Sequence, residues 1–114
     1  MSPIRSAAAN KAADAAPVFA ALADATRLRI LSRLCDEGPM SISRLSDGAG
    51  MTRQAVTKHL HALESAGLVR DARVGREHIF ELEPRRLEKA RRYLDHVAAS
   101  WDARIDRLKA YVER

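Results

Sequence analysis

The stretch that decides the fold begins at Met51 and reads MTRQAVTKHLHALESAGL, ending at Leu68. Thr52 favours the start of a helix, because a threonine hydroxyl at the N-cap accepts a free backbone N–H of the first turn. Gly67 favours the end of that helix, since helices commonly stop at a glycine in the left-handed conformation. Between these two signals, three apolar residues recur at helical spacing: Val56, Leu60 and Leu63. The stretch therefore predicts a helix with one apolar stripe.

The opposite face of this expected helix carries only hydrogen-bond donors and cations. These residues are Arg53, Gln54, Thr57, Lys58 and His61. Each can donate to phosphates or to base edges, and the first acid of the helix is Glu64. Such a face suits the major groove of DNA. An ordinary amphipathic surface helix is the alternative interpretation of this stretch alone.

The residues before this helix predict a helix-turn-helix. Ser41 is an N-cap candidate for a short helix from Ile42 to about Asp47, and the glycine-containing turn 48–50 follows it. A short helix, a tight turn and a second helix form this motif. Asp24 opens an earlier helix over about 25–36, which Gly-Pro at 38–39 ends. We expect Cys35 on its apolar side, as a small buried hydrophobe rather than a redox or metal residue.

The residues after Gly67 predict a β-hairpin. Residues 68–73 and 77–82 alternate as strands do, and Val74-Gly75-Arg76 joins them. A hairpin that directly follows a helix-turn-helix is a wing. Arg73 and Arg76 lie at its tip, where they suit a phosphate backbone or the minor groove. A solvated hairpin tip is the alternative interpretation.

Pro84 opens a long final helix to about Glu113, with apolar residues at near-heptad spacing. Five of these residues are candidates for a dimer interface: Leu94, Val97, Trp101, Ile105 and Leu108. The helix would be roughly 45 Å long, and a second copy would cover its stripe. We expect a flexible tail over 1–13, a winged helix-turn-helix over 14–83, and a dimerisation helix of the same domain over 84–114. The fold class is mainly α with a β-hairpin wing.

Composition limits the possible classes of function. The chain has 114 residues, which favours one domain. Its net charge of +5 favours a polyanionic partner. No apolar run approaches the length of a membrane span and no secretory signal is evident, so we expect a cytoplasmic protein without a membrane partner. Nucleophile motifs, phosphate-binding glycine loops and clustered carboxylates are absent from the sequence, so we do not expect an enzyme.

The segments ALADATRLRILSRL, SISRLSDGAGMTRQAVTKHLHALESAGLV and FEL together resemble the ArsR family of bacterial winged-helix repressors. The resemblance covers about residues 18–112. It implies a homodimer, paired through its terminal helices, that occupies a promoter operator and reads the major groove with the helix at Thr52. The ending WDARIDRLKAY resembles a branch that lacks metal sites, similar to the SdpR-type autorepressors.

The chain departs from the metal-sensing members of that family. Those members carry a Cys-x-Cys pair before the turn, where this chain reads SISRLSDG. The final helix has one histidine, His96, with Asp95 and Asp102 near it. Zinc needs about four ligands, so only a site shared between two chains remains as an alternative. We expect no metal and no cofactor.

The sequence thus predicts a sequence-specific DNA-binding regulator, a homodimeric repressor of its own or a neighbouring operon. Its partner would be double-stranded DNA with an imperfect inverted repeat. The candidates for base edges are Arg53, Gln54, Thr57 and His61, and the candidates for phosphate or minor-groove contacts are Thr52, Lys58, Arg73 and Arg76. A winged-helix architectural or protein-interaction module is the alternative. Target genes and any small-molecule or protein effector are not specified by the sequence.

Overall fold

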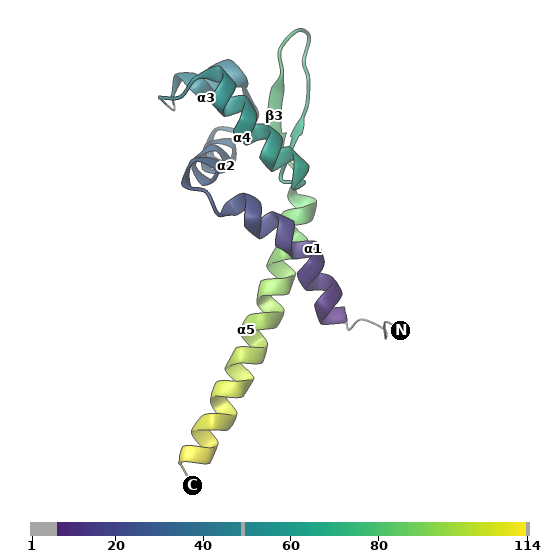
Figure 1. The fold of residues 1–114 in the computed structure, drawn as a ribbon, viewed down its shortest axis with the longest axis vertical. Coiled ribbons are helices and arrows are strands. Elements are labelled where there is room, and N and C mark those ends of the chain that lie inside the picture. The colour runs from purple at the N-terminus through teal and green to yellow at the C-terminus, as the bar shows by residue number, and fades with distance from the viewer. Residues whose placement is uncertain (1–6, 49, 114) are drawn as a thin grey trace.

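A computed structural model describes residues 7–48 and 50–113 of the chain. The described elements follow the order α1 (Ala7–Leu22), α2 (Ala25–Glu37), β1 (Met40–Ser41), α3 (Ile42–Asp47), α4 (Arg53–Ser65), β2 (Val69–Asp71), β3 (Ile79–Leu82) and α5 (Pro84–Val112). Helices α2, α3 and α4 lie together beside a protruding hairpin, and α5 leaves this body as a long arm (Figure 1). The fold is the predicted winged helix-turn-helix.

Side-chain caps start α2, α3 and α4, as the sequence predicts. The Asp24 carboxylate accepts the Arg27 backbone N–H at 3.0 Å, and this hydrogen bond holds the pKa of Asp24 below its usual value. The Ser41 hydroxyl accepts the Arg44 N–H at 3.1 Å, and the Thr52 hydroxyl accepts the Ala55 N–H at 3.1 Å. Each cap satisfies a donor that its helix leaves unpaired.

The predicted stripe of α4 lies at the centre of the core. Its three residues are fully buried: Val56, Leu60 and Leu63. Leu45 of α3, Ile30 and Leu34 of α2, and Phe80 of β3 are buried in the same cluster. The burial of this stripe fixes which side of α4 faces the solvent.

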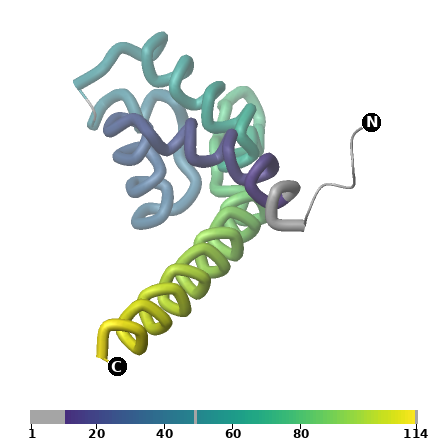
Figure 2. Tube along the Cα trace, turned by 60° about the horizontal axis from the view of Figure 1, so that its bottom comes forward, coloured from purple at the N-terminus to yellow at the C-terminus, as the bar shows by residue number. Residues whose placement is uncertain are grey.

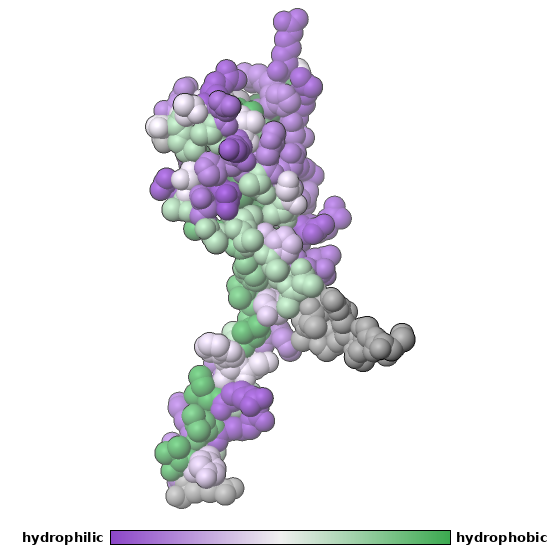
Figure 3. All heavy atoms as spheres, viewed as in Figure 1, coloured by the Kyte–Doolittle hydropathy of each residue, from purple (hydrophilic) through white to green (hydrophobic). Residues whose placement is uncertain are grey.

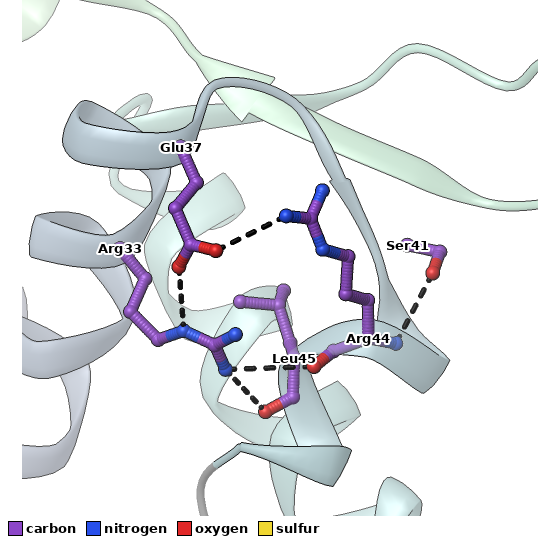
Figure 4. A network of polar contacts seen from close by, with 5 residues as sticks. All are labelled: Arg33, Glu37, Ser41, Arg44 and Leu45. Carbon is purple, nitrogen blue, oxygen red and sulfur yellow. Dashed lines mark hydrogen bonds and ion pairs between the residues drawn. The ribbon is translucent and has the colours of Figure 1, made fainter.

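Arg33 of α2 holds α3 in place (Figure 4). Its Nη1 donates to the backbone oxygen of Leu45 at 3.0 Å, and its Nε donates to Glu37 at 3.1 Å. Glu37 in turn accepts from Arg44 at 3.1 Å. Carbonyls in the last turn of a helix lack intrahelical partners, so this network ties α3 to α2 and sets the position of the helix-turn-helix.

The hairpin belongs to a three-stranded antiparallel sheet with the order β1-β3-β2. The outer strand β1, which pairs Met40 with Phe80, was not predicted from the sequence. Strands β2 and β3 are shorter than the expected ranges 68–73 and 77–82. Beyond Asp71 the hairpin projects into solvent, and two hydrogen bonds between Val74 and Glu77, both 3.1 Å, close its tip.

Helix α1 begins at Ala7, so the expected tail over 1–13 is wrong for residues 7–13. Alanine has the highest helix propensity, and α1 gains further from packing against α5. The rings of Phe19 and Tyr93 meet in that contact, with centroids 6.3 Å apart. Pro17 lies inside α1. Residues 1–6 of the expected tail lie outside the described residues.

Helix α5 extends far beyond the body of the protein (Figures 1 and 2). Ala90, near its start, is buried, whereas every described residue from Ala98 onward is exposed. The radius of gyration is 18.9 Å, against about 13 Å for a compact chain of this length. Within residues 7–48 and 50–113, no helix is both long enough and apolar enough to cross a membrane.

Gly67 is the position where we expect a single methyl group to destabilise the fold. Its φ is +78°, and a Cβ there would lie 2.5 Å from Cγ of Arg86. We expect Gly67→Ala to lower the free energy of unfolding by more than about 1 kcal/mol, because strain and a steric clash add. Gly50→Ala is the matched control, since Gly50 has φ +64° and open space around it. Urea unfolding should show a smaller loss for the control, and equal losses would contradict the clash.

Candidate nucleic-acid interface

The polar face of α4 forms one continuous surface of the molecule. A shallow hollow along it is lined by Thr52, Gln54, Ala55, Thr57, Lys58 and His61. Five of the eight residues predicted to contact DNA therefore lie together. Gln54, Lys58 and His61 are exposed, so their amide, ammonium and imidazole groups are free to approach a groove.

The hydrogen bonds of α4 refine the roles of its two threonines. The Thr57 hydroxyl donates to the Arg53 backbone oxygen at 2.8 Å. It therefore offers a base an acceptor and a methyl group, which suit an amino group and a thymine methyl. The Thr52 hydroxyl accepts a backbone N–H as the N-cap, and its own hydrogen remains available for a phosphate.

Arg53 lies apart from this hollow, on a second one between α3, α4 and the wing. This second hollow is lined from three parts of the chain. They are residues 41–43 at the start of α3, Arg53 of α4, and residues 76–78 of the wing. The structure therefore brings Arg53 to the wing arginine Arg76 rather than to Gln54. Neither Ser43 nor His78 was predicted from the sequence as a site residue, because no periodic signal links residues so far apart.

The wing presents Arg73 and Arg76 at its exposed tip. Gly75 has φ +60°, as does the first central residue of a type II′ hairpin turn. Arg70, on β2 and away from the tip, forms ion pairs with two glutamates. Its Nε lies 2.6 Å from Glu81 and its Nη1 lies 3.4 Å from Glu83. The hydrogen bond to Glu81 raises the pKa of Arg70. The tip arginines, rather than Arg70, are therefore the wing cations available to an anion.

Cys35 is exposed, so the prediction of a buried thiol is wrong. Ile30 and Leu34 face the core, and Cys35 lies about 100° further around α2, which turns it toward solvent. Leu28, on the same helix, is also 46% exposed. Among the residues that the structure describes, no three His, Cys, Asp or Glu side chains are grouped closely enough to hold a metal.

The apolar residues predicted to form a dimer interface lie on the protruding part of α5. Leu94 is 51% exposed, Trp101 69% and Leu108 63%. Ile105 is exposed and Val97 is half-buried. Figure 3 shows hydrophobic atoms gathered along this arm and hydrophilic atoms over the wing. A single chain thus leaves large apolar side chains in water, which is uncommon for a surface without a partner.

Comparison with known proteins identifies the family. A family model described as a helix-turn-helix domain matches residues 22–72. The HTH-type transcriptional regulator Rv2034 of Mycobacterium tuberculosis is 39% identical over 75 residues, which cover 66% of this chain and 69% of that protein. The structure of an ArsR-like transcriptional regulator from Rhodococcus sp. RHA1 is 40% identical, with a TM-score of 0.79, covering 89% of this chain and 94% of that one. The chain belongs to the ArsR family. It is a DNA-binding transcriptional regulator, as its sequence predicts.

A further relative extends the comparison to the assembled state. The homodimeric winged helix-turn-helix DNA-binding domain Mb0332 of Mycobacterium bovis is 29% identical, with a TM-score of 0.66, and the match covers 88% of this chain and 91% of that one. That relative is described as a possible ArsR-family regulator. The narrower resemblance of this chain to the SdpR-type branch stays a prediction.

Proposed function

We propose that this ArsR-family regulator is a homodimeric repressor that occupies an operator in its own or a neighbouring promoter. The observation that carries the proposal is the exposed face of α4. Gln54, Lys58 and His61 line one hollow along it, while the opposite face is fixed in the core. A helix held in this way, with donors and cations outward, fits the major groove. The cytoplasm is the compartment where such a repressor would meet its DNA.

The proposed dimer forms through α5. Leu94, Trp101 and Leu108 supply an exposed apolar stripe on a helix that leaves the body. A second copy of the same helix is complementary in chemistry and length, and a two-fold axis places the same patch on both partners. The homodimeric relative from Mycobacterium bovis supports the dimer itself.

The two-fold axis also determines the proposed operator. Two copies of α4 related by the axis would read an imperfect inverted repeat, with half-sites in successive major grooves on one side of the duplex. We assign Gln54, Thr57 and His61 to base edges. We assign Thr52, Lys58, Arg73 and Arg76 to phosphates or the minor groove, because they lie at the N-cap, along the flank of α4 and at the wing tip.

Selection of duplexes from a random-sequence pool tests this function. We expect the purified protein to enrich an inverted repeat whose half-site centres lie about ten base pairs apart or slightly more. The enriched duplex should survive competition by unrelated DNA. If no sequence is enriched while DNA is still bound, the architectural module is the better assignment, and an enriched single half-site would contradict the proposed dimer.

A further inference from the structure

The hollow between α3, α4 and the wing brings charged residues together, and the proposed repressor function assigns a role to only one of them, Arg76. It brings Arg53 of α4 together with Arg76, Glu77 and His78 of the wing, and Ser43 of α3 lines its remaining side. Arginine guanidinium groups are the side chains best matched to phosphate oxygens. The hollow therefore resembles an anion site whose net charge also depends on one glutamate and one histidine.

His78 is held by a carboxylate on the neighbouring strand. Its Nδ1 lies 2.7 Å from Oδ2 of Asp71. Since an ionised carboxylate only accepts hydrogen bonds, Nδ1 donates to it, and Nε2 is the ring nitrogen left for a ligand. In the neutral ring Nε2 is an acceptor, which an anionic oxygen avoids. Nε2 becomes a donor only when a proton from solvent binds to it.

The formal charges around His78 mean that this proton decides whether the cluster is neutral or positive. The groups that face it are Arg53 from α4, Arg76 and Glu77 from the wing, Asp71 from β2, and the uncharged Ser43 from α3. With His78 neutral, the two arginines are balanced by the two carboxylates. With His78 protonated, the cluster carries one net positive charge. Arg53, Arg76 and His78 can then all donate hydrogen bonds to a phosphate.

We propose that this hollow is a proton-linked phosphate site, which holds one DNA backbone phosphate between Arg53, Arg76 and Nε2 of His78. The inference rests on the proposed function, because α4 and the wing must lie on DNA. It assigns Arg53 to a phosphate, in place of the base edge predicted from the sequence. It also makes proton uptake by His78 part of DNA binding.

The direction of the pH dependence follows from this linkage. A bound phosphate favours the protonated ring, so the complex holds the proton more tightly than the free protein does. DNA affinity is therefore higher at acidic pH than at alkaline pH. A dimer carries two such sites, and we expect an affinity loss of about tenfold or more between about pH 6 and about pH 8.

The test measures fluorescence anisotropy at constant ionic strength with two duplexes, one selected by the wild-type protein and one of arbitrary sequence. A phosphate site acts on both duplexes. The variant His78→Gln should bind both more weakly at about pH 6 and lose most of the pH dependence. Glu77→Gln removes one carboxylate and should strengthen binding at about pH 8, with a smaller pH dependence. His96→Gln, on the exposed arm of α5 and outside the proposed DNA face, is the histidine control.

The outcomes separate this inference from the proposed function. Enrichment of an inverted repeat with an unchanged pH dependence in His78→Gln would overturn the phosphate site and leave the repressor intact. Unchanged affinity of Glu77→Gln at high pH would also contradict the site, and this variant keeps the backbone hydrogen bonds of the wing tip. Failure of the wild-type protein to bind either duplex at any pH would overturn the function and this site together.

Discussion

Trp101→Asp should convert the protein from a dimer to a folded monomer. Trp101 is 69% exposed in the single chain, so the substitution leaves the monomer core untouched. In a dimer paired through α5, it would place an unpaired charge in an apolar interface, and a buried tryptophan commonly contributes about 2 kcal/mol or more to binding. Two symmetry-related sites would raise the dissociation constant about a thousandfold. Sedimentation equilibrium measures this constant directly.

Ala103→Asp is the matched control for that experiment. Ala103 is exposed and lies two residues beyond Trp101, about 200° around the helix. The same charge on this face should leave the dimer intact. Circular dichroism should report equal helix content for both variants. A Trp101→Asp protein that remains a dimer at micromolar concentration would contradict pairing through this stripe.

The helix-turn-helix was predictable because local signals of different kinds agreed on it. The caps Asp24, Ser41 and Thr52 start their helices where the sequence places them. The apolar spacing of α4 identified its buried face, and the position of Gly67 identified its end. When capping, periodicity and turn residues agree, little is left for tertiary contacts to change.

The errors fall where local signals are weak. Strand β1 has two residues, too few to show alternation, and it forms because β3 offers Phe80 and Ile79 as partners. The start of α1 is an alanine-rich run without an apolar pattern, so the sequence offered only the helix propensity of alanine there. Cys35 follows Leu34 in the sequence, but the two side chains point about 100° apart around α2. This one helical position decides that Leu34 is buried and Cys35 is exposed.

The polar face of α4 was predictable as a set of residues but not as an arrangement. Gln54, Thr57 and His61 share one hollow, as helical geometry requires. Arg53 lies with Arg76 and His78 instead, because the path of the wing brings it beside the first turn of α4. That path depends on sheet pairing and hairpin twist, which residue spacing in the sequence does not encode.

Gln54→Ala should reduce sequence preference, whereas Arg76→Ala should reduce affinity for all DNA. The amide of Gln54 is exposed on α4 and can make a paired contact with adenine, worth roughly 1–3 kcal/mol per half-site. Two half-sites would lower the ratio of operator to scrambled-DNA affinity by about thirtyfold or more.

Arg76 is exposed at the wing tip. Its loss should flatten the slope of log affinity against log salt by about one unit per contact.

The central claim is that α4 reads base sequence, and one measurement tests it most directly. The affinities of the wild-type protein, Gln54→Ala and Arg76→Ala are determined for the selected operator and for a scrambled duplex, at several salt concentrations. We predict that the preference for the operator falls in Gln54→Ala and is kept in Arg76→Ala, and that the salt slope flattens only in Arg76→Ala. Equal losses on both duplexes for both variants, with the preference unchanged, would contradict sequence reading by α4.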